Sequence, residues 1–229
     1  MDPLVGKVFE GRYRLTALIG EGRSSTVYAA EETAANRQVA LRLLHFQADG
    51  ARYVTLRHEN IIPTYAAGRT FDGLAYLVSE RVRAPRLHHL LASHGAFPWQ
   101  RSIEILIQLC NVQHATEGHG LAAPLTTEKI YLESFDVVRA DYAPRMPPPM
   151  EPYETQSAVQ NIGVLAHEML SNELPPYLPP EHVGDPRLEL PAELEPLVIS
   201  CLRDRFARVS AVRDALLAIR AKVRPAAAT

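Results

Sequence analysis

A short glycine-containing turn between two strand-like segments could bind a phosphate group. Gly20 and Gly22 lie in this turn, and Arg42 lies in the next segment rich in valine and leucine. Glycine lets the backbone approach a ligand closely because it has no Cβ atom, and arginine stays charged at neutral pH. The pattern therefore indicates a phosphate-binding turn with a cation nearby. The glycines alone are equally consistent with a β-turn that binds no ligand, and Arg42 with a structural ion pair.

Strand-like segments in the first third of the chain predict the sheet that must position this turn. Short runs rich in β-branched and aromatic residues, separated by turn residues, are typical of strands. Residues 1–11 are interpreted as a lead-in. We expect a five-stranded antiparallel sheet and one short helix, with strands at residues 13–19, 26–30, 38–44, 61–66 and 74–79 and the helix at residues 50–57.

A polar connector at residues 80–85 marks a change to helical periodicity. Beyond it we expect a small hairpin at residues 130–132 and 137–140, and helices at residues 86–93, 98–117, 157–170, 193–202 and 210–223. These patterns predict an α+β protein with two domains. Residues 1–83 form the sheet and short helix, residues 84–223 are mainly helical, and residues 224–229 are a disordered tail or a linker.

The composition excludes some classes of partner. The chain has 229 residues, of which 47% are apolar, and a formal net charge of −2. This charge provides no basic surface for nucleic acid, and no apolar run is long enough to cross a bilayer. We therefore expect no nucleic-acid partner, no membrane insertion and a cytoplasmic location. Cys110 and Cys201 lie in apolar helical segments, which favours buried thiols over a disulfide.

Five short segments of the chain form an ordered set. They read Val39-Ala40-Leu41, Arg57-His58-Glu59-Asn60-Ile61-Ile62, Tyr76-Leu77-Val78-Ser79-Glu80, Gly163-Val164-Leu165-Ala166-His167-Glu168-Met169-Leu170 and Leu197-Val198-Ile199-Ser200-Cys201-Leu202. In this order they resemble segments of the protein kinase domain of bacterial serine/threonine kinases, and the resemblance extends over residues 13–223. The resemblance implies a two-lobed protein-kinase-like fold, with a small antiparallel-sheet N-lobe that has one short helix and a mainly helical C-lobe.

The resemblance also implies where ATP would bind. The implied residues are Gly20, Gly22, Val27, Ala40, Arg42, Glu80, Val82 and Asp141. Arg42 stands where the family has a lysine, so the charge is kept but the planar guanidinium is bulkier than an ammonium group. Asp49 lies nearest the position of the glutamate that holds this lysine in the family. We favour a loop or helix-cap role for Asp49 over an ion pair with Arg42.

The stretch that matches the catalytic loop, residues 122–129, departs from the family pattern. Pro124 stands where the family has the aspartate that orients the substrate hydroxyl, and proline has no ionisable group. Lys129 stands where the family has a metal-binding asparagine, and a cation there repels Mg²⁺. If the register slips by one residue, Glu128 occupies this position and could bind metal.

Asp141 matches the metal-binding aspartate of the family. It is a weak metal candidate, and we favour an ion pair with Lys129 or Arg42. The segment after it is short and rich in proline, at residues 144–152, unlike the long activation segment of the family. Ala158 replaces the helical aspartate that anchors the catalytic loop in the family, which is consistent with a loop that no longer needs positioning.

Together these departures predict a pseudokinase that is not an enzyme, with Arg42, Pro124 and Lys129 as degenerate catalytic positions. We expect a protein-binding scaffold or allosteric regulator, whose partners are other proteins such as an active kinase or signalling component. We expect no metal site, and either no cofactor or weak ATP binding with or without Mg²⁺. Two alternatives stay open: a sensor that binds ATP without transferring phosphate, and an atypical, weakly active serine/threonine kinase.

Overall fold

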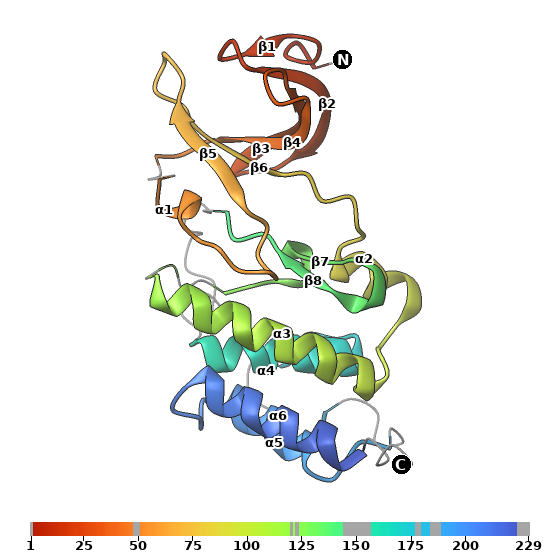
Figure 1. Ribbon diagram of the computed structural model, residues 1–229. Coiled ribbons are helices and arrows are strands. Elements are labelled where there is room, and N and C mark those ends of the chain that lie inside the picture. Colours follow the sequence, from red (N-terminus) through yellow and green to blue (C-terminus); the bar gives the residue numbers. More distant parts are fainter. Residues whose placement is uncertain are drawn as a thin grey trace, which may run out of the picture. The chain divides into compact units, whose positions relative to one another are not determined.

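The computed structural model of the chain describes residues 2–47, 51–119, 121, 124–143, 157–176, 180–183 and 189–223. The chain forms two compact units, each of which is described by itself (Figure 1). The first comprises Met1–Arg83 and Tyr142–Met150, and the second comprises Ala84–Asp141 and Glu151–Thr229. The division after Arg83 falls within the polar connector.

The first unit is built on a six-stranded antiparallel sheet with the strand order β1-β2-β3-β4-β6-β5 (Figure 1). Its elements are β1 (Val8–Phe9), β2 (Tyr13–Glu21), β3 (Ser25–Glu32), β4 (Arg37–Leu44), α1 (Ala51–Val54), β5 (Thr64–Arg69) and β6 (Ala75–Glu80). The antiparallel sheet is confirmed, but the predicted number of five strands is wrong. β1 was missed because a strand of two residues is too short to show a pattern.

The N-terminal residues, which we predicted to be a lead-in, are part of this unit. Leu4, Val5 and Phe9 pack against the buried apolar core of the sheet. The hydroxyl of Tyr28 donates a hydrogen bond of 3.0 Å to a carboxylate oxygen of Asp2, which fastens the start of the chain to β3. These contacts depend on partners distant in the sequence, so local patterns could not predict them.

Strand β4 presents different residues on its two faces. Val39 and Leu41 are fully buried in the core of the sheet, whereas Ala40 and Arg42 are half-buried. Successive side chains of a strand point to opposite faces, so Ala40 and Arg42 share the face that is turned away from Val39 and Leu41. This face carries the candidate site.

The second unit is mainly helical. Its elements are α2 (Leu87–His94), α3 (Trp99–Gly118), the short 3₁₀ helix η1 (Thr127–Lys129), β7 (Ile130–Leu132), a second 3₁₀ turn η2 (Ser134–Asp136), β8 (Val138–Ala140), α4 (Ala158–Ser171), α5 (Leu194–Leu202) and α6 (Val209–Val223). β7 and β8 form the predicted antiparallel hairpin. The bounds of the five α-helices differ from the predicted ones by no more than one residue at each end. The predicted α+β class is therefore confirmed.

Two local features explain how α4 forms and packs. The Ser157 side chain accepts a hydrogen bond from the backbone N–H of Gln160, and the Gln160 side chain accepts one from the N–H of Ser157. This capping box provides acceptors for two backbone N–H groups at the start of the helix. Gly163 lets α4 approach α5 closely, because a Cβ atom there would lie 2.8 Å from the backbone nitrogen of Leu202. Cys110 and Cys201 are buried and free, as predicted.

In the part of the chain that the structure describes, no helix is both long and apolar enough to cross a membrane. The cytoplasmic location stays a prediction.

Candidate functional site

The glycine-containing turn connects β2 to β3 in the first unit. The N–H of Gly22 donates a hydrogen bond of 3.0 Å to the carbonyl oxygen of Ser25, which closes the turn. Neither Gly20 nor Gly22 has a positive φ. A Cβ atom at Gly20 would meet Val27 at 3.7 Å, and one at Gly22 would meet the Ser25 oxygen at 3.9 Å, both ordinary contacts. The turn itself therefore does not require glycine, and the missing side chains leave its backbone open to a ligand.

Three of the predicted ligand-binding residues lie side by side across three strands. Gly20 is the register partner of Val27, and Val27 is the register partner of Arg42. Directly opposite residues of antiparallel strands have their side chains on one face of the sheet. Ala40 shares this face because it lies two residues before Arg42 on β4. The site is thus an apolar surface with a cation at one end.

The guanidinium group of Arg42 is directed toward the turn. Its Nη1 atom lies 3.5 Å from the hydroxyl oxygen of Ser25, which is buried at the start of β3. Arginine is positively charged at any ordinary pH and can contact two oxygens of one phosphate group. The geometry therefore allows Arg42 to bind an anion that lies beneath the turn.

Two further predicted residues lie at the end of the sheet. Glu80 is the last residue of β6, where its N–H donates a hydrogen bond of 3.0 Å to the carbonyl oxygen of Pro63. Val82 follows in the connector and is half-buried. Because Glu80 is opposite Val39 rather than Ala40, its side chain is not on the Arg42 face. The structure therefore groups Gly20, Val27, Ala40 and Arg42, and leaves Glu80 outside this group.

In the second unit, the loop before η1 is held firmly by the buried side chain of Asn161 from α4. The backbone N–H of Leu125 donates to Asn161 Oδ1 over 3.0 Å, and Asn161 Nδ2 donates to the Leu125 carbonyl over 2.9 Å. Gln113 of α3 also donates to Asn161 Oδ1, over 2.6 Å. Asn161 therefore positions this loop, whereas the Ala158 side chain has no polar group that could do so. An amide among the buried apolar residues of α4 was the signal that could have identified Asn161.

Asp141 and Lys129 are adjacent in the structure. The backbone N–H of Asp141 donates a hydrogen bond of 2.8 Å to the carbonyl oxygen of Lys129. Pro124 precedes this region and is half-buried, whereas Glu128 is exposed on η1. Pro124, Glu128, Lys129 and Asp141 thus belong to one short segment of loop, 3₁₀ helix and hairpin in the second unit.

Glu168 of α4 is a carboxylate near this loop that motif matching did not assign to the site. Its Oε1 atom accepts a hydrogen bond of 2.8 Å from the Thr127 hydroxyl. Burial raises the pKa of Glu168, and the Thr127 hydrogen bond acts in the opposite direction. A carboxyl group with a raised pKa can hold or transfer a proton more readily near neutral pH.

Among the residues that the structure describes, no group of three or more histidine, cysteine, aspartate or glutamate side chains could hold a metal ion. A nucleotide-bound Mg²⁺ needs fewer protein ligands, since phosphates and water complete its coordination. Asp141 could therefore hold Mg²⁺ only together with phosphate groups. Asp49, Ala122, Ala123 and the Pro-rich segment at residues 144–152 lie outside the described residues.

The chain is similar in sequence to bacterial serine/threonine kinases, although no family model matches it. It is 30% identical to the probable serine/threonine-protein kinase PknB of Corynebacterium glutamicum and 29% identical to PrkC of Bacillus subtilis, and each match covers 50% of this chain and 20% of the relative. It is 26% identical to the serine/threonine-protein kinase PknA of Mycobacterium tuberculosis, over 98% of this chain and 65% of PknA. The chain thus spans only a part of each relative.

A solved structure has a similar fold. The crystal structure of Rad53 1–466 in complex with AMP-PNP superposes with a TM-score of 0.72 at 16% identity, over 89% of this chain and 64% of that one. At this identity the likeness shows the fold alone, and it confirms the predicted kinase-like fold.

The relatives overturn the prediction that the chain is not an enzyme. All three are named as serine/threonine kinases, and the PknA match covers almost the whole chain. The prediction rested on residues missing at single positions, above all the aspartate replaced by Pro124. A missing residue does not establish inactivity, because carboxylates such as Glu128, Asp141 and Glu168 lie on the same or contacting elements.

Proposed function

We propose that this chain, a protein-kinase-like domain related to bacterial serine/threonine kinases, binds ATP on the sheet face of Val27, Ala40 and Arg42. The proposal rests on one row of residues across three strands. In this row Gly20 leaves its backbone accessible, Val27 supplies an apolar side chain and Arg42 supplies a cation. An adenine ring can pack on small apolar side chains, and phosphates can pair with arginine. The Rad53 structure, solved with the ATP analogue AMP-PNP, supports this choice of ligand.

A thermal-shift titration tests ATP binding. ATP should raise the melting temperature of the wild-type chain, because a ligand that binds only the folded state stabilises it. Arg42→Ala should weaken binding by about tenfold or more, the effect of losing a charge-assisted hydrogen bond. Arg42→Lys is the matched variant that keeps the charge and should retain part of the affinity. No shift at millimolar ATP, with or without Mg²⁺, would contradict the proposal.

We also propose that the bound ATP is used for phosphoryl transfer to a protein serine or threonine, as the names of the relatives suggest. Pro124 cannot accept a proton, so the substrate hydroxyl must be oriented by another group. Asp141 and Glu128 are candidate carboxylates of the second unit, and Asp141 is the candidate Mg²⁺ ligand.

Labelled ATP and a protein substrate test the transfer separately from binding. Labelling by the wild-type chain that falls in Asp141→Asn or Glu128→Gln supports the proposal and identifies the carboxylate that is used. Equal labelling by the wild type and both variants would exclude a role of Asp141 and Glu128 in the transfer. If the chain binds ATP but labels no substrate, the proposed transfer is refuted and the proposed ATP binding is not.

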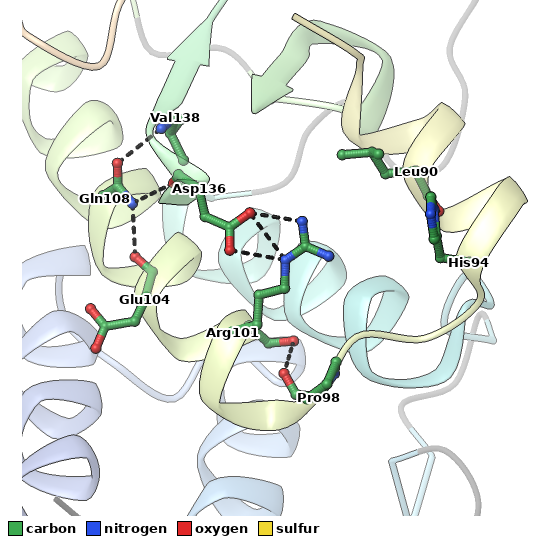
Figure 2. A network of polar contacts seen from close by, with 9 residues as sticks. Leu90, His94, Pro98, Arg101, Glu104, Gln108, Asp136 and Val138 are labelled. Carbon is green, nitrogen blue, oxygen red and sulfur yellow. Dashed lines mark hydrogen bonds and ion pairs between the residues drawn. The ribbon is translucent and has the colours of Figure 1, made fainter. Parts of the chain in front are cut away.

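A second candidate function, self-association, is favoured by the hairpin turn of the second unit. Phe135 and Asp136 have φ values of 61° and 57°, which non-glycine residues rarely adopt, and Phe135 is fully exposed. Figure 2 shows the contacts that hold the turn. Arg101 donates hydrogen bonds of 3.0 Å from Nε and 2.7 Å from Nη2 to the Asp136 carboxylate. The Gln108 side chain donates to the carbonyl oxygen of Asp136 and accepts from the N–H of Val138. These contacts hold the backbone of the turn, from which the Phe135 side chain projects into solvent.

A hollow next to this turn could receive the phenyl ring of a second copy. It measures about 450 Å³ and is lined by Ala84, Pro85, Leu132, Glu133 and Ser134. Since Ser134 lines the hollow and belongs to the same turn as Phe135, two copies could exchange rings in a two-fold symmetric dimer. Other protein partners, such as an active kinase, stay a prediction.

Sedimentation velocity over a range of concentrations tests the self-association. The wild-type chain should show a concentration-dependent dimer that Phe135→Ser abolishes. Phe71→Ser is the matched control, because Phe71 is equally exposed but lies in the first unit. A wild-type monomer at all concentrations, or equal dimerisation of both variants, would exclude this role of Phe135.

A further inference from the structure

One histidine ties the glycine-containing turn to the end of β4. His45 follows Leu44, the last residue of β4, and its N–H donates a hydrogen bond of 3.0 Å to the carbonyl oxygen of Ser24. Its ring makes two more contacts: Nδ1 lies 3.2 Å from the carbonyl oxygen of Arg23, and Nε2 lies 2.9 Å from the hydroxyl oxygen of Thr26. His45 thus contacts two residues of the turn, Arg23 and Ser24, and Thr26 at the start of β3.

The two partners determine which nitrogen of the His45 ring carries the proton. A carbonyl oxygen can only accept a hydrogen bond, so Nδ1 must carry the proton that is donated to Arg23. In a neutral ring Nε2 then accepts a hydrogen bond from the Thr26 hydroxyl. Both ring nitrogens are engaged by the protein, so His45 acts through the turn rather than by contact with a ligand.

Little else restrains this turn from within. Three residues, 22–24, lie between β2 and β3, and the hydrogen bond from Gly22 to Ser25 is local. Gly22 and Arg23 are exposed, so side-chain packing holds neither residue. Strand pairing holds the two ends of the turn, and the ring of His45, which is itself exposed, adds contacts to Arg23 and Thr26.

We propose that His45 is a positioning residue that holds the turn in the conformation that receives the phosphates of ATP. The inference rests on the proposed ATP binding. It goes beyond it because it attributes the fixed conformation of the turn to one side chain. Backbone N–H groups of a turn bind phosphates best when they are already oriented, since a mobile turn loses conformational freedom on binding. Because His45 restrains the turn before ATP binds, less conformational entropy is lost on binding.

Matched variants separate the ring contacts from the fold. His45→Ala removes both ring contacts and keeps the backbone hydrogen bond to Ser24. His45→Asn keeps a donor near the position of Nδ1 and should restore part of the effect. Thr26→Val removes the hydroxyl at similar volume, whereas Thr26→Ser keeps it. His114→Ala, which changes an exposed histidine of α3, is the control.

The experiment combines amide hydrogen exchange, measured by NMR without nucleotide, with calorimetric titration of ATP. In His45→Ala the amides of residues 22–26 should exchange about tenfold faster, and ATP affinity should fall about three- to tenfold, as expected for the loss of one or two neutral hydrogen bonds. Thr26→Val should show a smaller effect of the same kind. His45→Asn, Thr26→Ser and His114→Ala should stay closer to the wild type.

The two readouts keep this inference distinct from the proposed function. Unchanged exchange in His45→Ala would overturn the inference even if the wild-type chain binds ATP. Faster exchange with unchanged ATP affinity would overturn the role of His45 in binding. If the wild-type chain binds no ATP, the proposed function fails and the role of His45 in binding fails with it, whereas the exchange data still decide whether His45 holds the turn.

Discussion

At the scale of single residues, Glu32 shows how a buried charge can stabilise the first unit. Its side chain is almost completely buried and accepts hydrogen bonds from Arg37 and from Arg12, with Nε distances of 3.0 and 2.8 Å. The Arg37 guanidinium also lies 3.7 Å from the centre of the Tyr65 ring. The hydrogen bond from Arg37, followed by that from Arg12, lowers the pKa of Glu32, although burial opposes the shift.

We predict that Glu32→Gln lowers the free energy of unfolding by about 1–3 kcal/mol at neutral pH, because two arginines lose their charged partner. A lowered pKa means that the ionised form stabilises the fold above the unfolded pKa of about 4.3, and that this stability is lost as the pH falls through the lower folded value. The difference between wild type and variant in urea unfolding should therefore shrink below about pH 4. Glu31→Gln is the control, and a difference independent of pH would contradict the explanation.

At the scale of elements, Asn161 links α3, α4 and the loop before η1. It satisfies both backbone groups of Leu125 and receives the Gln113 side chain, and all three residues are buried. A single amide therefore satisfies both backbone groups of a buried loop residue and ties it to two helices.

Asn161→Leu should lower the free energy of unfolding by about 2–4 kcal/mol, because it leaves buried polar groups of Leu125 and Gln113 without their partner. Asn161→Asp keeps the acceptor but loses the donor to the Leu125 carbonyl and buries a charge, so it should also destabilise the chain. Chemical unfolding measures the loss, and hydrogen exchange at Leu125 locates it. A stable Asn161→Leu variant with normal exchange at Leu125 would show that the loop is held by other contacts.

The contact between α4 and α5 provides a second test at this scale. A Cβ atom at Gly163 would lie 2.8 Å from Leu202 N and 2.9 Å from Cys201 Cβ, whereas one at Gly118 would meet nothing within 4 Å. Gly163→Ala should therefore destabilise the chain by about 1–3 kcal/mol, and Gly118→Ala should leave its stability unchanged or slightly raised. Equal melting temperatures of the two variants would show that the helices can move apart at little cost.

At the scale of the whole molecule, periodicity along the sequence predicted most of the fold. The sheet and the five long helices of the described chain have repeats long enough to recognise, whereas β1 has only two residues. Because Leu4 and Val5 act through packing on the sheet, the part played by the N-terminal segment could not be predicted from local pattern.

The candidate site was predictable to the extent that it follows a motif. Gly20, Val27, Ala40 and Arg42 were implied by the resemblance to the kinase family, and strand register brings them together. Residues that act across long sequence separations were missed: Asn161 contacts Leu125 over 36 positions, Glu168 contacts Thr127 over 41, and His45 contacts Thr26 over 19. The motif recorded the aspartate replaced by Pro124 and not the carboxylate of Glu168, which accepts a hydrogen bond from Thr127 of η1.

The central claim, that ATP binds on the Arg42 face of the first unit, is tested most directly by a hydrogen-exchange footprint of the wild-type chain with and without ATP. ATP should slow exchange in residues 20–26, and this protection should be lost in Arg42→Ala. Bound ATP that leaves these residues unchanged, or that protects only α5 and α6, would contradict the claim.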